Sequence, residues 1–282
     1  MIEPEHNRIE WTESFPEPQS PEYATVPAVE PVVLPQAPSF PPWSAWDVAG
    51  VLAFTVATIV LMSAIALGAA HLFGGGRHTA LGDLASNPIV VIGSQMAAYP
   101  LVIAFMMVLV RNKSGLDFWR AIQWNWPGRR AILFLLNGMA FAFLVEFASR
   151  YLPIPKSLPV DKYFNDTLGA YLMAIFGITL APLLEELFFR GMFYPLVRRA
   201  AGVAAAVLIT ATTFAFIHGG QLGYAWAPLA SIFVVGLVFT LVRERTGSVA
   251  ASFLMHCGYN FALFASLWVA SDGFLHLDKA LN

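Results

Sequence analysis

Two adjacent carboxylates and a nearby arginine lie inside an apolar stretch in the second half of the chain. They are Glu185, Glu186 and Arg190, in the run APLLEELFFR. On a helix, residues four apart share a face, so Glu186 and Arg190 are predicted to form an internal ion pair. Glu185 is rotated by about 100° from Glu186 and has Phe189, not a base, four residues on. An unpaired carboxylate in apolar surroundings can act as a general base near neutral pH, although both acids could instead line a polar seam without chemistry.

Two histidines and an asparagine follow in later apolar runs. His218 ends the run FAFIH, and His256 and Asn260 are four residues apart on one helix face. Taken alone, His218 is more often a satisfied core residue, and the His256–Asn260 pair more often makes simple interhelical hydrogen bonds. An ionisable group at bilayer depth costs on the order of 2.5–3.5 kcal/mol, so such residues are rare unless they are paired or functional.

The runs that contain these residues are long enough to cross a membrane. The chain has 282 residues, of which 57% are hydrophobic and 12% charged, whereas soluble domains carry about 25% charged residues. Roughly 20 consecutive apolar residues are needed for one helical crossing. We therefore predict an all-α polytopic transmembrane helix bundle, with an eighth span or a re-entrant piece as the alternative to seven. The predicted spans are about 46–73, 88–110, 131–149, 167–190, 203–218, 227–242 and 249–270.

These spans bring the polar residues to similar depths. Glu185 and His218 each lie roughly 21–22 Å of helix from the predicted turn at residues 200–202. His256 and Asn260 lie roughly 10 and 16 Å into the last span. Placing these four polar side chains at similar depth in a membrane costs free energy. Their occurrence together, on three helices, predicts a functional site.

The segment before the first span differs in composition from the rest. Residues 1–42 contain ten prolines, seven glutamates and one arginine, which predicts a disordered, partly polyproline II tail. We divide the remainder into N-terminal membrane helices (43–164), a catalytic membrane core (165–270) and a C-terminal tail (271–282). The single cysteine, Cys257, excludes an internal disulfide framework.

The basic residues predict an orientation. With the N-terminus inside, ten Lys and Arg residues fall on the cytoplasmic side and five on the other. The positive-inside rule therefore favours a cytoplasmic N-terminus. The cytoplasmic set is Arg8, Arg111, Lys113, Arg120, Arg129, Arg130, Arg198, Arg199, Arg243 and Arg245, and the opposite set is Arg77, Arg150, Lys156, Lys162 and Lys279. No basic cluster with a stacking platform is present, so no nucleic-acid partner is expected.

Three motifs, in order and on successive predicted membrane helices, resemble those of the type II CAAX prenyl endopeptidase and bacteriocin-processing protease family, also called CPBP or Abi. The run EELFFR from Glu185 matches Glu-Glu-x-x-x-Arg, FAFIH matches Phe-x-x-x-His, and HCGYN from His256 matches His-x-x-x-Asn/Asp. The resemblance covers roughly residues 165–270. It implies an intramembrane endopeptidase that hydrolyses a peptide bond with a water activated inside the membrane.

Carried over to these positions, the resemblance assigns roles. It implies that Glu185 is the general base, that His218 helps to position and activate water, and that His256 and Asn260 donate to the developing oxyanion. Glu186 and Arg190 would brace the first motif. The family is often labelled as metalloprotease, and Glu185, His218 and His256 would make a plausible two-histidine, one-glutamate zinc set. A metal-free glutamate mechanism fits the same residues, so no cofactor is certain.

The resemblance also implies which partners the protein has and which other functions should be considered. We expect membrane lipid and a hydrophobic or lipidated peptide or protein substrate as partners, and the composition favours a bacterial plasma membrane. The second hypothesis is a non-catalytic immunity or scaffold protein of the same fold. A transporter is less favoured, because no broken-helix repeat is visible in the sequence.

Overall fold

The computed structural model describes residues 40–73, 80–164 and 166–276, and every regular element in these ranges is helical. The predicted all-α class is therefore confirmed. Of the predicted tail, residues 1–42, all but the last three lie outside the described residues. The helices are α1 (Ala45–Phe73), α2 (Leu81–Ser86), α3 (Pro88–Ser114), α4 (Phe118–Ala121), α5 (Ala131–Ser149), α6 (Thr167–Ile178), α7 (Leu180–Glu186), α8 (Tyr194–Ile217), α9 (Trp226–Thr246) and α10 (Val249–Ala270), with short 3₁₀ turns η2 (Gly128–Arg130) and η3 (Pro159–Phe164) and a π-helical segment η4 (Leu187–Phe193).

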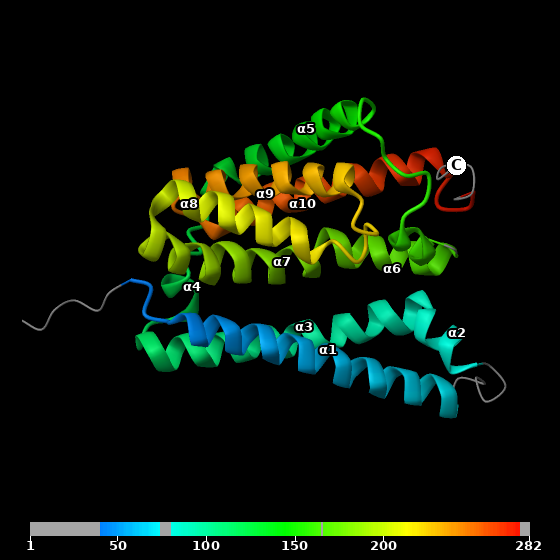
Figure 1. Cartoon of the computed structure of the whole chain (residues 1–282), viewed down its shortest axis with the longest axis horizontal. Helices are drawn as coiled ribbons and strands as arrows, with labels where there is room; N and C mark the ends of the chain where they lie inside the picture. Colours follow the sequence, from blue (N-terminus) through cyan, green and yellow to red (C-terminus); the bar gives the residue numbers. More distant parts are fainter. Residues whose placement is uncertain (1–39, 74–79, 165, 277–282) are drawn as a thin grey trace, which may run out of the picture. The chain divides into compact units, whose positions relative to one another are not determined.

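Six helices in the described part of the chain are long and apolar enough to cross a membrane. The fourth, Thr167–Ile217, is 51 residues long because α6, α7, η4 and α8 run on from one another. It contains the predicted fourth and fifth spans, and the chain reverses direction inside it at Gly202, whose φ is 78° (Figure 1). A positive φ is readily adopted by glycine, which has no Cβ. Tyr194 and Val207 pack together across this turn, so the bundle makes seven passes.

Polar side chains fix where several helices begin. The Asn87 side chain accepts the backbone N–H of Ile89 at the start of α3, and Asp166 accepts that of Gly169 at the start of α6. The Ser248 hydroxyl accepts the Ala251 N–H at the start of α10. Side-chain acceptors of this kind satisfy backbone donors that have no partner within the helix.

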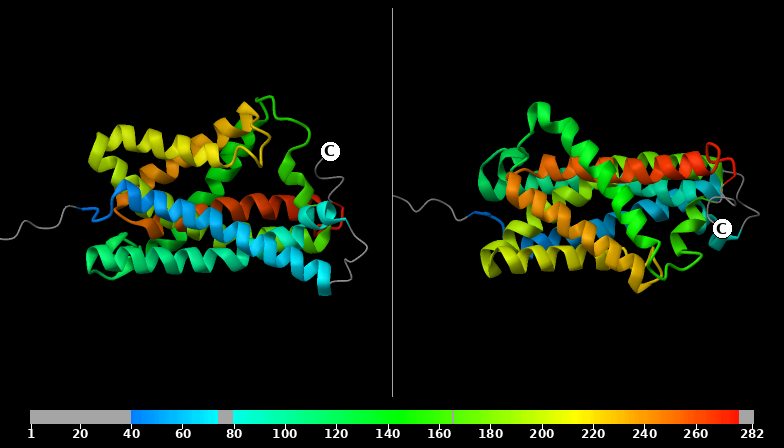
Figure 2. Two further views of the ribbon diagram at one scale, coloured as in Figure 1. Left: turned by 60° about the horizontal axis from the view of Figure 1, so that its bottom comes forward. Right: turned by 90° about the horizontal axis from the view of Figure 1, so that it is seen from above.

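The passes place the connections at two ends of the bundle, which we call the near end and the far end (Figures 1 and 2). The near end is where α1 begins, and it holds residues 115–130, the Gly202 turn and residues 247–248. The far end holds α2, residues 150–164, residues 218–225 and residues 271–276.

Small residues let α5 and α10 approach closely. A Cβ on Gly258 of α10 would clash with the backbone carbonyl of Leu135 on α5, and a Cβ on Gly138 would clash with that of Met255. Membrane helices use small residues in this way because van der Waals packing drives their association. This packing fixes α10, which carries His256 and Asn260, against α5.

Candidate active site

The first motif continues into a π-helical segment. The Tyr194 N–H bonds to the carbonyl of Phe189, five residues earlier, and Pro195 has no N–H to offer. The carbonyl of Arg190 is thereby left without a backbone donor, and the Arg243 Nε–H donates to it at 3.2 Å. Single π turns in helices are often found at functional sites.

The ion pair predicted from the spacing of Glu186 and Arg190 is present. Arg190 Nη1 lies 2.9 Å from Glu186 Oε1, and both side chains are 0% exposed. Arg190 Nη2 also donates to the Gly236 carbonyl of α9 at 3.0 Å. The guanidinium lies over the Phe214 ring, 4.5 Å from its centre. The charge of Arg190 is therefore compensated by a carboxylate, a carbonyl dipole and an aromatic face.

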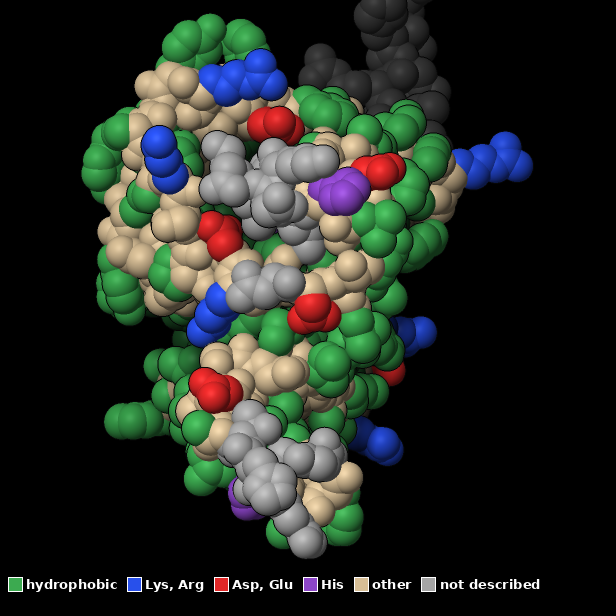
Figure 3. Space-filling view, turned by 90° about the vertical axis from the view of Figure 1, so that its right-hand side faces the viewer, with side chains coloured by type: hydrophobic (Ala, Val, Ile, Leu, Met, Phe, Trp, Pro, Cys, Tyr) green, Lys and Arg blue, Asp and Glu red, His purple; other side chains and the backbone are tan. Residues whose placement is uncertain are grey.

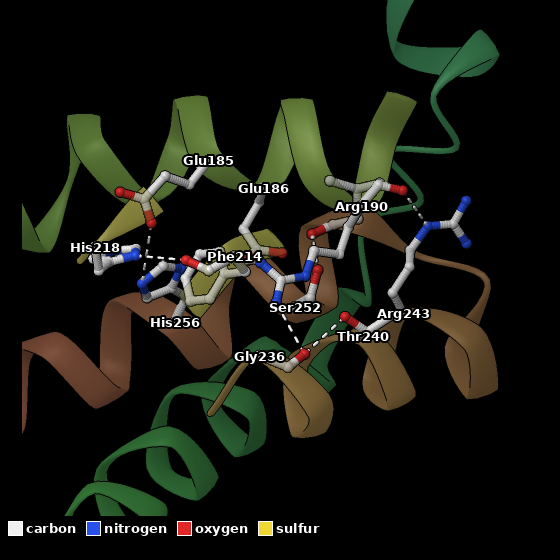
Figure 4. Close-up of polar contacts among 11 residues, drawn as sticks. Glu185, Glu186, Arg190, Phe214, His218, Gly236, Thr240, Arg243, Ser252 and His256 are labelled. Carbon is white, nitrogen blue, oxygen red and sulfur yellow. Dashed lines mark hydrogen bonds and ion pairs between the residues drawn. The ribbon is translucent and has the colours of Figure 1, made fainter. Parts of the chain in front are cut away.

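His256 lies between the two adjacent glutamates (Figure 4). Its Nδ1 lies 3.0 Å from Glu186 Oε1, and its Nε2 lies 3.8 Å from Glu185 Oε2. Glu186 Oε1 also accepts a hydrogen bond from the Arg190 guanidinium, so it acts as an acceptor toward His256 as well. The proton of the bond between Glu186 and His256 is therefore carried by His256 Nδ1. The Nε2 side therefore faces Glu185 across a gap that is longer than a hydrogen bond, the kind of separation that a water bridges.

The four residues that the sequence singles out for chemistry line one cavity of about 240 Å³. Glu185 comes from α7, His218 from the end of α8, and His256 and Asn260 from α10. Glu185 and His218 line the same cavity, as expected from their similar distances along the helices to the predicted turn. His218 Nδ1 donates to the Phe214 carbonyl at 2.7 Å, which leaves Nε2 as the nitrogen available for chemistry.

Asn260 is also engaged with a neighbouring helix. Its Nδ2 donates to the Gly177 carbonyl of α6 at 2.6 Å. This hydrogen bond uses one of the two amide hydrogens, and the second stays available for a reacting group. Asn260 thus joins α6 to α10 while it lines the cavity.

Several contributors are absent from the motif-based prediction. Gln95 and Tyr99 of α3 line the same cavity, and their only signal in the sequence is that they are polar residues inside an apolar run. The bond from His256 to Glu186 joins two motifs that sequence spacing does not connect. Arg243, which the sequence counts among the connection charges, is only 4% exposed and lies within α9.

The proposed zinc set is not assembled as a ligand group. In the ranges that the structure describes, no three His, Cys, Asp or Glu side chains are grouped closely enough to hold a metal ion. Glu185, His218 and His256 share the cavity without converging on one point at ligand distances.

The comparisons with known proteins bear on the same helices. Residues 167–262 match the family model described as type II CAAX prenyl endopeptidase Rce1-like, which is 96 of the 282 residues. No match was found among curated proteins or among solved structures. The matched range runs from the start of α6 into α10 and includes all four of the cavity residues predicted from the sequence. Over this segment the chain is similar to the Rce1-like family of type II CAAX prenyl endopeptidases.

Proposed function

We propose that this protein is an intramembrane endopeptidase that hydrolyses a peptide bond of a hydrophobic substrate with a water activated by Glu185. The observation that carries the proposal is the convergence of Glu185, His218, His256 and Asn260 on one cavity within a membrane bundle. Each of these groups is costly at bilayer depth. A fold that needed only stability would not gather them from three helices.

The reaction follows from the positions of the acceptors and donors. Glu185 removes a proton from a water in the cavity, and the oxygen of that water attacks the carbonyl carbon of the scissile bond. The tetrahedral oxyanion receives an N–H hydrogen bond from Asn260. His218 Nε2 carries no proton while Nδ1 donates to Phe214, so it accepts a hydrogen bond from the water or the substrate. The proton held by Glu185 then passes to the leaving nitrogen as the C–N bond breaks. The products are one carboxyl and one amine terminus, and Glu185 returns to its starting state.

His256 and Glu186 position the groups that carry out this reaction. The Glu186 carboxylate holds His256 Nδ1 at 3.0 Å and so directs Nε2 toward Glu185. In that position His256 holds the water at the Glu185 carboxylate. Arg190 holds the Glu186 carboxylate in place through the 2.9 Å ion pair.

The lining of the cavity favours an apolar substrate. Aromatic and aliphatic side chains make up most of it, among them Phe164, Phe176, Ile232, Leu263 and Phe264. Such a surface suits apolar side chains or a lipid group attached to the peptide. We propose membrane lipid and a hydrophobic or lipidated polypeptide as the partners, and no zinc requirement for turnover.

The test is cleavage of a fluorogenic apolar peptide, with and without a farnesylated cysteine, by the purified protein in lipid vesicles. In H₂¹⁸O, hydrolysis places one ¹⁸O atom in the new carboxyl terminus, detected by mass spectrometry. Glu185→Gln is expected to lower the rate by about 10²–10⁴-fold, the usual contribution of a general base. Glu146→Gln, on α5 and outside the cavity lining, is the matched control and should leave the rate unchanged.

Three results would oppose the proposal or part of it. Cleavage by Glu185→Gln at the normal rate would remove the carboxylate from the mechanism. A cellular phenotype that survives in the Glu185→Ala, His218→Ala double variant would favour the non-catalytic immunity or scaffold function. Loss of activity after chelation, restored by zinc, would show that a metal takes part.

A further inference from the structure

The cavity is lined by connections from one end of the bundle only. Val160, Tyr163 and Phe164 come from η3, and Gln221 comes from the α8–α9 connection, both at the far end. The near-end connections contribute none of the described residues that line it. Among the described connections, only those of the far end therefore line the cavity.

A short fifth pass favours an opening at the far end. The arm of α8 after the Gly202 turn, Val203–Ile217, has 15 residues, about 22 Å of helix, against about 30 Å for a bilayer core. His218, at its end, is thus recessed below the far-end surface. The connection that follows is held at this level, since the Gln221 N–H donates to the His218 carbonyl at 3.1 Å and the Val160 N–H donates to the Gln221 carbonyl at 3.0 Å.

The opposite side of the cavity is closed by the buried charges of the first motif. Glu186 and Arg190 are 0% exposed, and Arg190 is enclosed by the rings of Phe189, Phe214 and Phe239. The chain runs from Glu185 through this layer to the Gly202 turn at the near end, so the layer lies between the reacting groups and that end (Figure 1). A substrate cannot reach Glu185 from the near end without breaking it.

The distribution of basic residues identifies the near end as cytoplasmic. Among the described residues, nine Lys and Arg belong to the near-end segments: Arg111, Lys113, Arg120, Arg129, Arg130, Arg198, Arg199, Arg243 and Arg245. The far-end segments hold three, Arg150, Lys156 and Lys162, together with Asp83, Asp161, Asp166 and Asp272. Figure 3 shows the far end with acidic and basic side chains interspersed. Connections rich in Lys and Arg stay in the cytoplasm.

We propose that the cavity opens on the non-cytoplasmic side of the membrane and takes an apolar stretch of a polypeptide exposed on that surface. This inference rests on the proposed function for its substrate and on the cavity geometry for its side. The mouth residues Val160, Tyr163, Phe164 and Phe264 are apolar or aromatic, and Gln221 carries no charge. The residues that flank the cleaved bond are accordingly uncharged, and the substrate has crossed the membrane before it is cut.

Thiol labelling tests the side directly. Cys257→Ala removes the single cysteine, and Gln221→Cys then places one thiol at the mouth. Lys156→Cys marks the far-end surface and Asn112→Cys the near-end surface, both at exposed positions. A membrane-impermeant maleimide should label Gln221→Cys and Lys156→Cys in right-side-out vesicles, and Asn112→Cys only in inverted vesicles.

Labelling of Gln221→Cys from the cytoplasmic side alone would overturn the proposal, as would its failure to label from outside when Lys156→Cys does. Because labelling needs no turnover, the same pattern is expected in the Glu185→Gln background. The fluorogenic apolar peptide, added outside sealed vesicles, should be cut at least tenfold faster in right-side-out than in inverted vesicles, and detergent should abolish the difference. Outside labelling without cleavage in either vesicle would count against the proteolytic function only.

Discussion

The buried side chains of Glu186, Arg190 and His256 form one connected set of polar contacts. The Glu186 carboxylate accepts from both Arg190 and His256 through the same oxygen, Oε1. Its second oxygen, Oε2, is buried, and no described residue meets the geometry of a hydrogen bond to it. Loss of the guanidinium would leave this carboxylate with the imidazole alone, in surroundings where an unpaired charge is expensive.

Arg190→Met is therefore expected to destabilise the protein by about 3–5 kcal/mol, the usual effect of breaking a buried ion pair. Arg198→Met is the matched control. It removes the 3.1 Å pair with Glu244, in which the Arg198 side chain is 51% exposed, and should change stability by about 0–1 kcal/mol. Unfolding in detergent measures both. Equal losses in the two variants would show that the buried pair contributes no more than a surface pair.

The π-helical segment η4 is held from two other parts of the chain. Arg243 of α9 donates to the Arg190 carbonyl and, through Nη2, to Gln123 Oε1 at 2.6 Å. The Trp43 indole N–H, from just before α1, donates to the Met192 carbonyl at 2.9 Å. These bonds satisfy acceptors in a helix segment that departs from the regular α pattern, so they fix the course of the first motif.

Arg243→Met is expected to lower stability by about 1–3 kcal/mol, because it leaves a buried carbonyl without a donor. Arg245→Met, on the exposed side of the same last turn, removes an equal charge and should have little effect. Thermal unfolding of both variants in detergent gives the comparison. A loss of the same size in Arg245→Met would attribute the effect to net charge rather than to the bond with η4.

The close approach of α5 and α10 predicts that a larger residue at Gly258 destabilises the bundle. Gly258→Ala should destabilise the bundle by about 1–3 kcal/mol, because its Cβ meets the Leu135 backbone, which cannot move aside alone. Gly93→Ala in α3, where an added Cβ meets nothing within 4 Å, is the control and should be neutral or slightly stabilising. If both variants melt alike, close helix contact does not position α10.

The bundle as a whole makes an odd number of passes. In residues 40–73, 80–164 and 166–276, six membrane-competent helices, one of them folded back at Gly202, make seven passes. Trp43 and Phe274, near the two limits of the described bundle, are both buried, which ties the first and last passes into the fold. An eighth crossing or a re-entrant piece is not among the described helices.

Tags inserted at Ser44 and at His276, near the two limits of the described helices, should therefore lie on opposite sides of the membrane. In right-side-out vesicles, external protease is expected to remove the C-terminal tag and leave the N-terminal tag, with the reverse in inverted vesicles. Immunoblotting of both tags gives the readout, and detergent-solubilised protein is the control for cleavability. Removal of both tags from one side would require an even number of passes.

Much of this architecture can be predicted from the sequence, because a bilayer restricts what a polar residue or a short apolar run can do. The predicted limits 131–149 and 249–270 coincide with α5 and α10. The i, i+4 spacing alone predicts the Glu186–Arg190 pair, since helix geometry is local. The alignment of Glu185 with His218 follows from counting residues on both sides of one turn.

What spacing cannot give is contact between helices that are distant in the chain. The bond from His256 to Glu186, the approach of Gln95 and Tyr99 from α3, and the donation from Arg243 to η4 all depend on how helices tilt and rotate against each other. The far-end opening likewise follows from the shortness of one arm beside longer neighbours, and a single hydropathy profile does not show this. Side-chain packing sets these relations, and it arises only when all seven passes are assembled.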